Sequence, residues 1–293
     1  MAIDSVLRQT HDDLEVVVVV DGPHPPTEKL LRSHADPRVR TIVNPSNLGT
    51  SGARNVGVVA ADGRWIGFLD DDDVWLPAKL TRQLDLLGRS PYGTVASGRI
   101  IRRTPQGDFI GPQHPPHEGE HMSEWLFRPR PPLERATRVQ PSALLMPREL
   151  AIDLPWDAQL PFYEIHDWLL RAAAVGARLT LTEDPVYVWN IHESSISSQN
   201  AANWRETLEF IRARRHLVTR RAYAWYILDR VATRAALAPD GPSLAFLVHE
   251  ARRHGQPSAV DVARCMLRLW TPSGIRQTIR DGLASLRTRR PSR

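Results

Sequence analysis

Short apolar runs, typical of buried strands, recur through the first part of the chain. Each run is rich in β-branched or aromatic residues, is five to seven residues long and is followed by polar or turn-forming residues. Runs of this kind without apolar–polar alternation are typical of strands covered on both faces. Three such strands are predicted, at 16–20 ("VVVVV"), 38–44 ("RVRTIVN") and 64–69 ("RWIGFL").

Segments with helical spacing separate these runs. Residues 26–35 ("PTEKLLRSHA") form one predicted helix, with Thr27 as its N-cap, and residues 51–63 form another that ends at Gly63 as C′ residue. A third predicted helix follows the last of the three runs, over 76–88. Strands that alternate with helices indicate an α/β fold with a mostly parallel central sheet.

The pattern changes after residue 94. Residues 94–109 are predicted to form a hairpin with a turn at "PQGD", and residues 139–150 a strand with a helix start. Residues 166–177 form a predicted helix that ends near Gly176, and residues 177–192 the last strands. From about 203 the spacing is helical throughout, with Gly and Pro between the segments. We expect two regions, a catalytic α/β domain over 1–202 and a helical appendage over 203–293.

Composition narrows the class of protein. The 293 residues are 42% hydrophobic and 24% charged, as in an ordinary globular chain. Cys265 is the single cysteine, which excludes an internal disulfide or a cysteine zinc cluster and fits a reducing compartment. The first residues lack the features of a signal peptide, and no apolar run approaches the ~20 residues that span a bilayer. We expect a cytoplasmic protein, with peripheral association at the inner face of the membrane as an alternative.

The charge is +5, and its excess is arginine at 212–221 and in the ending "RTRRPSR". Such charge could attract nucleic acid or anionic lipid, but solvated helix faces and a frayed tail are the favoured explanation. Because no nucleic-acid-binding signature accompanies the arginines, no nucleic-acid partner is expected.

Four consecutive aspartates, Asp70 to Asp73, follow the strand predicted at 64–69. Ligands of open α/β sheets bind beyond the carboxyl ends of strands, where Mg²⁺ or Mn²⁺ on a nucleotide takes one or two protein carboxylates. The alternative is an acidic turn that caps the following helix. An EF-hand is excluded, because its loop pattern is absent.

The surroundings of the aspartates resemble the family 2 glycosyltransferases, which have the GT-A fold. The resemblance is carried by "NLGTSGARNVGVVAADGRWIGFLDDDDVWLPAKL", with "AIDSVLRQTHDDLEVVVVVDG", "HDWLLR" and "VWNIHESSIS". It implies inverting, metal-dependent transfer of a sugar from a nucleotide diphosphate sugar to an acceptor. Mn²⁺ or Mg²⁺ would be the cofactor, and a cell-envelope glycan or lipid-linked sugar the acceptor.

The resemblance also assigns roles within the acidic cluster. Asp70 and Asp72 match the first and last aspartates of the family's D-x-D motif. Asp72 is assigned to the metal, and Asp70 or Asp71 to the ribose and the hydration shell of the metal.

Three residues upstream match positions that line the nucleotide pocket in this family. Asp21 matches the aspartate that reads the base, with a buried turn as its alternative role. Arg54 and Asn55 match the helix beside the nucleotide, although Arg54 could instead pair with the nearby aspartates.

The general base has two candidates. The family shows an acidic pair before an aromatic residue and "LWLR", and this chain has "YEIHDWLLR". The "HDW" match favours Asp167, for which a helix-surface salt bridge is the alternative. Counting back from Arg171 without a gap places the base position at Ile165, with Glu164 beside it.

Histidines occur in a late motif and in one loop. "WNIHESSIS" resembles a family motif that returns to the diphosphate, so His192 is a candidate metal ligand or phosphate donor and Ser195 a further donor. His114, His117 and His121 lack helical ligand spacing and are expected in an acceptor-side loop.

The chain departs from the family pattern at its start, because Met1 begins directly at the helix that normally follows a first strand. That strand lies centrally in the family's sheet, so an unpaired edge is expected here. Either translation starts further upstream or the chain is a remnant that binds nucleotide weakly. Two other functions stay open: a nucleotidyltransferase of related fold and a non-catalytic binding protein.

Overall fold

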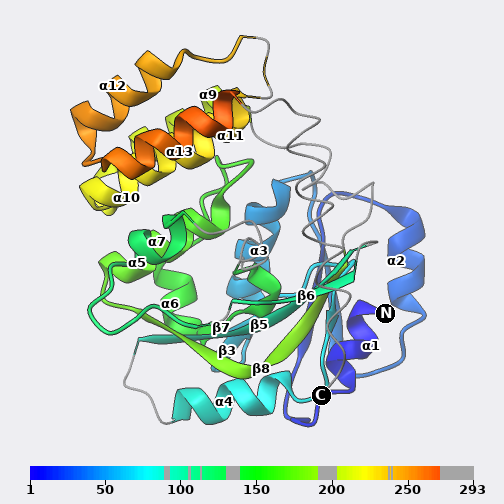
Figure 1. The fold of residues 1–293 in the computed structure, drawn as a ribbon. Helices are drawn as coiled ribbons and strands as arrows, with labels where there is room; N and C mark the ends of the chain where they lie inside the picture. The colour runs from blue at the N-terminus through cyan, green and yellow to red at the C-terminus, as the bar shows by residue number, and fades with distance from the viewer. Residues whose placement is uncertain are drawn as a thin grey trace. The chain divides into compact units, whose positions relative to one another are not determined.

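The computed structural model describes residues 1–88, 93–104, 107–112, 114–129, 139–190, 203–236, 238 and 240–270. The chain forms two compact units (Figure 1). Unit 1 comprises residues 1–115 and 136–192, and unit 2 comprises residues 116–135 and 193–293.

A small parallel sheet opens unit 1. Strand β1 (Val16–Val20) pairs in register with β2 (Val39–Val43), and α2 (Pro25–Arg32) connects them. Helix α3 (Gly49–Ala60) follows and packs against β1. This arrangement confirms the predicted alternation of strands and helices.

The main sheet of unit 1 has six strands. Its order is β3-β7-β5-β8-β4, with β6 paired to β5. The bounds are β3 (Trp65–Gly67), β4 (Val74–Trp75), β5 (Thr94–Thr104), β6 (Gly107–Gly111), β7 (Leu145–Pro147) and β8 (Arg178–Asn190).

The main sheet is more antiparallel than the sequence predicted. Within it β5 and β8 pair in parallel, whereas the pairs β3–β7, β5–β7, β4–β8 and β5–β6 are antiparallel. Strands β5 and β6 are close neighbours in sequence, and a connection that short joins only antiparallel strands. The prediction of a mostly parallel sheet was therefore too simple, although the α/β class is correct.

The two sheets share no pairing among the described strands. Strand β1 pairs with β2, and β3 pairs with β7 at one end of the main sheet.

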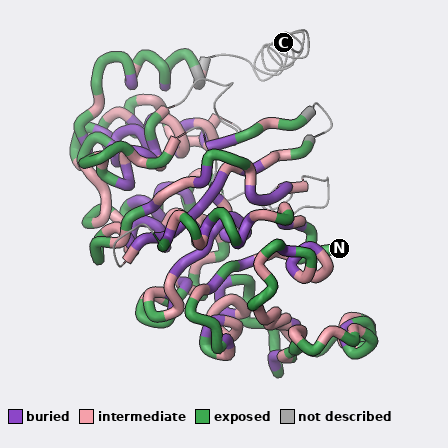
Figure 2. Tube along the Cα trace, turned by 90° about the horizontal axis from the view of Figure 1, so that it is seen from below, coloured by how far each residue is buried: buried purple, intermediate pink, exposed green. Residues whose placement is uncertain are grey.

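Helices cover the main sheet on both sides. Helix α4 (Lys79–Gly88) contacts β5 and β8, whereas α6 (Arg148–Asp153) contacts β3 and β7. Figure 1 shows α4 and α6 on opposite sides of the sheet. Buried and exposed stretches alternate along the helices in Figure 2, as one-sided packing requires.

Two helix boundaries differ from the predictions. His24, not Thr27, is the N-cap of α2, since its Nδ1 accepts from the backbone N–H of Thr27. Helix α3 ends at Ala60, and Ala61 is already extended, so Gly63 is not its C′ residue. Glu15 explains the early end, because its Oε1 accepts from the N–H groups of Asp62 and Gly63.

The regular elements described in unit 2 are all helices. Its elements are α5 (Met122–Phe127), α9 (Trp204–Ala213), the short 3₁₀ turn η3 (Arg215–Leu217), α10 (Arg220–Trp225), the π-helical segment η4 (Tyr226–Val231), α11 (Ala232–Ala235), α12 (Leu244–His254) and α13 (Ala259–Trp270). Within the described parts of the chain, no helix is both long enough and apolar enough to cross a bilayer.

Candidate active site

Polar side chains meet at the carboxyl ends of β1 and β2. Asp21 follows β1, and its Oδ1 accepts from Asn44 Nδ2 at 2.9 Å and from the backbone N–H of Leu48 at 2.8 Å. Asn44 follows β2 and is buried. Gly22 adopts φ +104°, which glycine tolerates and which turns the chain away at this point. Asp21 is thus fixed at the edge of the small sheet.

Arg54 of α3 joins two acidic residues that are far apart in sequence. Its Nη2 lies 2.9 Å from Asp70 Oδ1, and its Nη1 lies 3.6 Å from Glu164 Oε1. The side chain is only 8% exposed, and its guanidinium lies over the ring of Trp156. An arginine stacked on an aromatic ring has few alternative positions, so it holds both carboxylates on one side of unit 1.

The aspartate cluster has an exposed part and a buried part. Asp71 and Asp72 are exposed, Asp70 is partly exposed and Asp73 is buried. The turn is held by Ser142 Oγ, which accepts from the Asp70 N–H, and by Asn190 Nδ2, which donates to the Asp72 carbonyl. The exposed carboxylates are therefore presented by a fixed backbone.

Burial and neighbouring charge act on Asp73. Burial, together with the charges of Asp70 and Asp72, raises the pKa of Asp73 to about 7, against the lowering effect of its hydrogen bond with Ser142. Its Oδ1 has no hydrogen-bond partner among the described residues. The same carboxylates and burial also raise the pKa of Tyr187 well above its ordinary value. The cluster thus concentrates negative charge that a cation would relieve.

Asn55 fastens α3 to a distant loop. Its Nδ2 donates to the Trp156 carbonyl and its Oδ1 accepts from the Trp156 N–H, both at 2.8 Å. Both ends of the amide are therefore engaged by backbone. Asn55 positions Trp156, and Trp156 in turn lies under Arg54.

The two candidate bases lie on α7 (Glu164–Ala174) in different surroundings. Asp167 is almost fully buried, and its Oδ2 accepts from Arg171 Nε at 2.7 Å. Glu164 is 25% exposed and faces Arg54. Tyr163, directly before it, adopts the left-handed conformation with φ 66°, which is strained for a tyrosine. The structure thus brings Glu164, rather than Asp167, to the aspartate cluster.

The donor set fits a divalent cation that takes most of its ligands from elsewhere. Among the described residues, no group of three or more His, Cys, Asp or Glu side chains could hold a metal by itself. Mg²⁺ on a nucleotide usually needs only one or two carboxylates, with phosphate and water as the other ligands. The exposed carboxylates of Asp71 and Asp72 meet that need. His192 and Ser195 lie outside the described residues.

Sequence reasoning missed three supporting residues. Asn44 was signalled only by its place after a strand, at the same sheet edge as Asp21. Ser142 contacts Asp70, which is 72 positions away in the sequence, and Trp156 contacts Asn55, which is 101 positions away. No local sequence pattern predicts contacts over such separations.

Comparison with known proteins agrees with this arrangement. The family model described as "Glycosyl transferase family 2" matches residues 1–151. The succinoglycan biosynthesis protein ExoO of Rhizobium meliloti is 30% identical over 204 residues, which are 67% of this chain and 58% of that protein. The Escherichia coli protein WfgD, a "UDP-Glc:alpha-D-GlcNAc-diphosphoundecaprenol beta-1,3-glucosyltransferase", is 31% identical over 119 residues, 38% of this chain and 45% of that protein. The chain thus spans about half the length of these two relatives.

Among solved structures, S. aureus TarS 1–349 in complex with UDP-GlcNAc is similar in fold. The TM-score is 0.60 at 15% identity, over 94% of this chain and 87% of TarS 1–349. At that identity the likeness concerns the fold alone, and the fold is the GT-A arrangement. The match of the family model covers more than half of the chain, and the chain belongs to glycosyltransferase family 2.

Proposed function

We propose that this protein transfers a sugar from a nucleotide diphosphate sugar to a hydroxyl group, with inversion and with the help of Mn²⁺ or Mg²⁺. The observation that carries the proposal is Arg54, which joins Asp70 of the aspartate cluster to Glu164 of α7. A donor with a charged leaving group and an acceptor hydroxyl need both acidic elements at one place.

The donor is assigned to the side formed by the strand ends. Asp21, which accepts a hydrogen bond from Asn44, would read the base, and Asp70 or Asp71 would meet the ribose and the hydration shell of the metal. Asp72 would hold the cation, whose charge neutralises the diphosphate as it leaves. Ligation by His192 stays a prediction. The names of WfgD and TarS support a UDP-sugar as the donor class.

Glu164 is the base that the geometry favours. In the proposed step, the acceptor oxygen attacks the anomeric carbon, the bond from that carbon to the diphosphate oxygen breaks, and the hydroxyl proton passes to Glu164. Nucleoside diphosphate is the leaving group. Arg54 would direct Glu164 at the site before the reaction. Asp167 remains the second candidate, although its carboxylate is engaged by Arg171.

The printed names of two relatives support an acceptor class. ExoO is named for succinoglycan biosynthesis and WfgD for a diphosphoundecaprenol-linked sugar. We therefore propose a cell-envelope glycan or a lipid-linked sugar as acceptor, and a cytoplasmic location where nucleotide sugars are available.

The test is a product assay with UDP-sugars and Mn²⁺, in which UDP and pyrophosphate are both measured. Release of UDP that stops on chelation of the metal is the expected result. Asp72→Asn should lower turnover at least a hundredfold, because one metal carboxylate is lost. Asp13→Asn, which changes an exposed aspartate away from the cluster, should leave turnover unchanged.

Other products would favour the alternatives. Pyrophosphate from a nucleoside triphosphate and a sugar phosphate would identify a nucleotidyltransferase. Absence of any turnover, with UDP binding retained and unaffected by Asp72→Asn, would identify a binding protein and contradict the proposal.

A further inference from the structure

The exposed apolar side chains of unit 2 gather on its last two described helices. Among the described residues of this unit, the exposed large hydrophobics are Phe246 of α12 and Val260, Met266 and Leu267 of α13. Val260 is 57% exposed and Leu267 is 68% exposed. Their concentration on two neighbouring helices calls for a physical explanation, since scattered single residues would not.

These side chains are not the core-facing side of the helices. Both α12 and α13 contact η4, and they bury other residues there: Leu247 and Ala251 on α12, and Cys265 on α13. Helix α13 thus has one side in the core of unit 2 and a second, exposed apolar set of Val260, Met266 and Leu267, to which α12 adds Phe246. A helix that only covers a core would carry polar residues on that outer face.

The charge on the outer faces has one sign. Arg252, Arg253 and Arg264 are exposed, and no described carboxylate pairs with them. The acidic residues of the two helices, Glu250 and Asp261, are buried. Glu250 pairs with Arg212, and Asp261 accepts from Ser258 at the start of its own helix.

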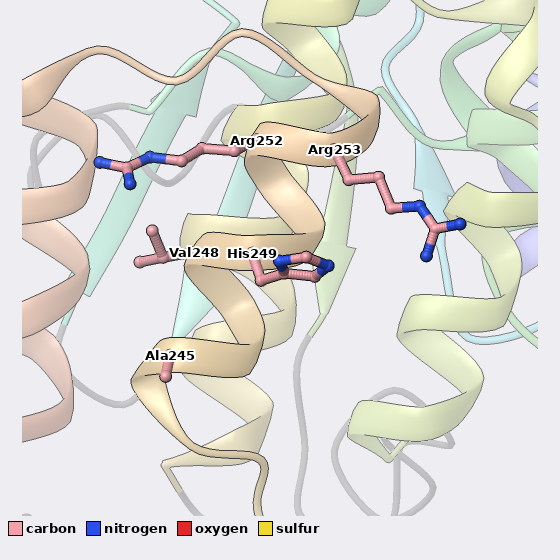
Figure 3. A pocket seen from close by; sticks show the side chains of 5 residues that line it. All are labelled: Ala245, Val248, His249, Arg252 and Arg253. Carbon is pink, nitrogen blue, oxygen red and sulfur yellow. The ribbon is translucent and has the colours of Figure 1, made fainter.

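A shallow hollow on α12 lies within this basic region. It is lined by Ala245, Val248, His249, Arg252 and Arg253. In Figure 3, Arg252 and Val248 point to one side of the helix, whereas Arg253 and His249 point to the other. The two arginines therefore flank the outer face of α12 and leave their guanidinium groups open to a broad anionic surface rather than to one small anion.

We propose that the α12–α13 surface, formed by Phe246, Arg252, Arg253, Val260, Arg264 and Leu267, docks on a lipid bilayer that contains anionic lipids. Arginines with no exposed carboxylates among them complement headgroup phosphates, and apolar side chains beside them enter the boundary of the acyl chains. Nucleic acid would match the arginines and leave the leucine and valine without a partner. The proposal goes beyond the proposed function and does not depend on it.

The test measures binding of the full chain to sedimented vesicles of phosphatidylcholine, with and without phosphatidylglycerol. Binding is expected with the anionic lipid and should weaken as salt is raised. Arg252→Glu and Arg253→Glu should each weaken binding by about fivefold or more. Leu267→Asp and Val260→Asp should each weaken it on the order of tenfold. Because both apolar positions are exposed, these variants should keep the helical circular dichroism of the native protein.

Matched controls come from unit 1, where Val175 is 65% exposed and Arg178 is also exposed. Val175→Asp and Arg178→Glu should bind vesicles as the native protein does. Four results would overturn the proposal: no binding of the native protein, equal binding to neutral vesicles, equal loss in the controls, or full binding by the Leu267→Asp and Val260→Asp variants. The last result would assign binding to the arginine-rich sequence after residue 270. A dimer that Leu267→Asp dissociates, without vesicle binding, would identify a second copy as the occupant.

Discussion

Glu164 and Asp167 lie three positions apart on α7, and what holds each carboxylate decides what it can do. Asp167 is nearly inaccessible and bound to Arg171, whereas Glu164 is partly exposed and shares Arg54 with Asp70. Local sequence could not separate them, because both fit an acidic position before "WLLR". The separation comes from Arg54, which lies more than a hundred positions earlier.

Glu164→Gln and Asp167→Asn should therefore have different effects. Glu164→Gln should lower kcat by at least a hundredfold with little change in stability, because the proposed base is lost and the shape of the side chain is kept. Asp167→Asn should lower the free energy of unfolding by about 1–3 kcal/mol, because the charged hydrogen bond from Arg171 is weakened. Steady-state kinetics and urea unfolding of both variants provide the measurements. A stable, inactive Asp167→Asn protein beside an active Glu164→Gln protein would exchange the two assignments.

At the scale of elements, the strands were easier to predict than their partners. The runs at 16–20, 38–44 and 64–69 gave β1, β2 and β3, because β-branched clusters are a local property. Pairing direction depends on connections that return from far along the chain, so the antiparallel share of the main sheet was not visible. The ends of α2 and α3 were displaced because His24 and Glu15, rather than the residues expected, satisfy the free N–H groups.

The pairing of β5 with β8 depends on one glycine. The register shifts between Gly98 and Arg99, and a Cβ at position 98 would meet the side chains of Val186 and Thr182. Gly98→Ala should lower the free energy of unfolding by about 1–3 kcal/mol, through overpacking. Gly88→Ala, at the end of α4 where a Cβ meets nothing, is the control and should not destabilise. Urea unfolding measures both, and equal stability of the two variants would contradict the account.

Glu250 connects three helices of unit 2 and makes their packing sensitive to pH. The hydrogen bond from Arg212, with a further one from the Tyr223 hydroxyl, lowers the pKa of Glu250 to about 2, although burial opposes the shift. An acid whose pKa is lowered by folding stabilises the native state above its ordinary pKa of 4.5. That contribution is lost as pH falls from about 4.5 towards 2.

Glu250→Gln should consequently cost about 3 kcal/mol at pH 7, and the difference from the native protein should shrink below pH 4. Glu209→Gln, on the exposed side of α9, should have little effect at either pH. Thermal unfolding followed at several pH values provides the measurement. A difference that stays constant with pH would show that the pair with Arg212 does not supply this stability.

For the whole molecule, binding and stability should be linked. If UDP and Mn²⁺ bind the folded state alone, each raises its free energy of unfolding according to its concentration, by about 2.7 kcal/mol at a hundred times the dissociation constant. UDP with Mn²⁺ should therefore raise the Tm of the native protein, whereas Asp72→Asn should abolish the contribution of the metal. Differential scanning calorimetry with and without chelator tests this. A Tm that UDP and Mn²⁺ leave unchanged would contradict nucleotide binding by this chain.

The sequence revealed the α/β class, the aspartate cluster and the family because each depends on residues close together in the chain. The contacts that join the residues of the candidate site were harder to predict from the sequence. The sequence offered two roles for Arg54, and its ion pair with Asp70 matches one of them. Its contact with Glu164 and its position over Trp156 could be seen only in the folded chain. Residues that only support others lack a distinctive chemistry that could reveal them.

The two hydrogen bonds between Asn55 and Trp156 can form only after residue 156 has been synthesised. The two residues are 101 positions apart, so at roughly 5–20 residues per second the ribosome adds the second one roughly 5–20 s after the first. During that interval the nascent chain carries α3 and the aspartates without the loop that completes their surroundings. A nascent polypeptide arrested before residue 156 should therefore fail to retain nucleotide, however well its strands have formed. The candidate site is a product of late translation, although most of its acidic residues are made early.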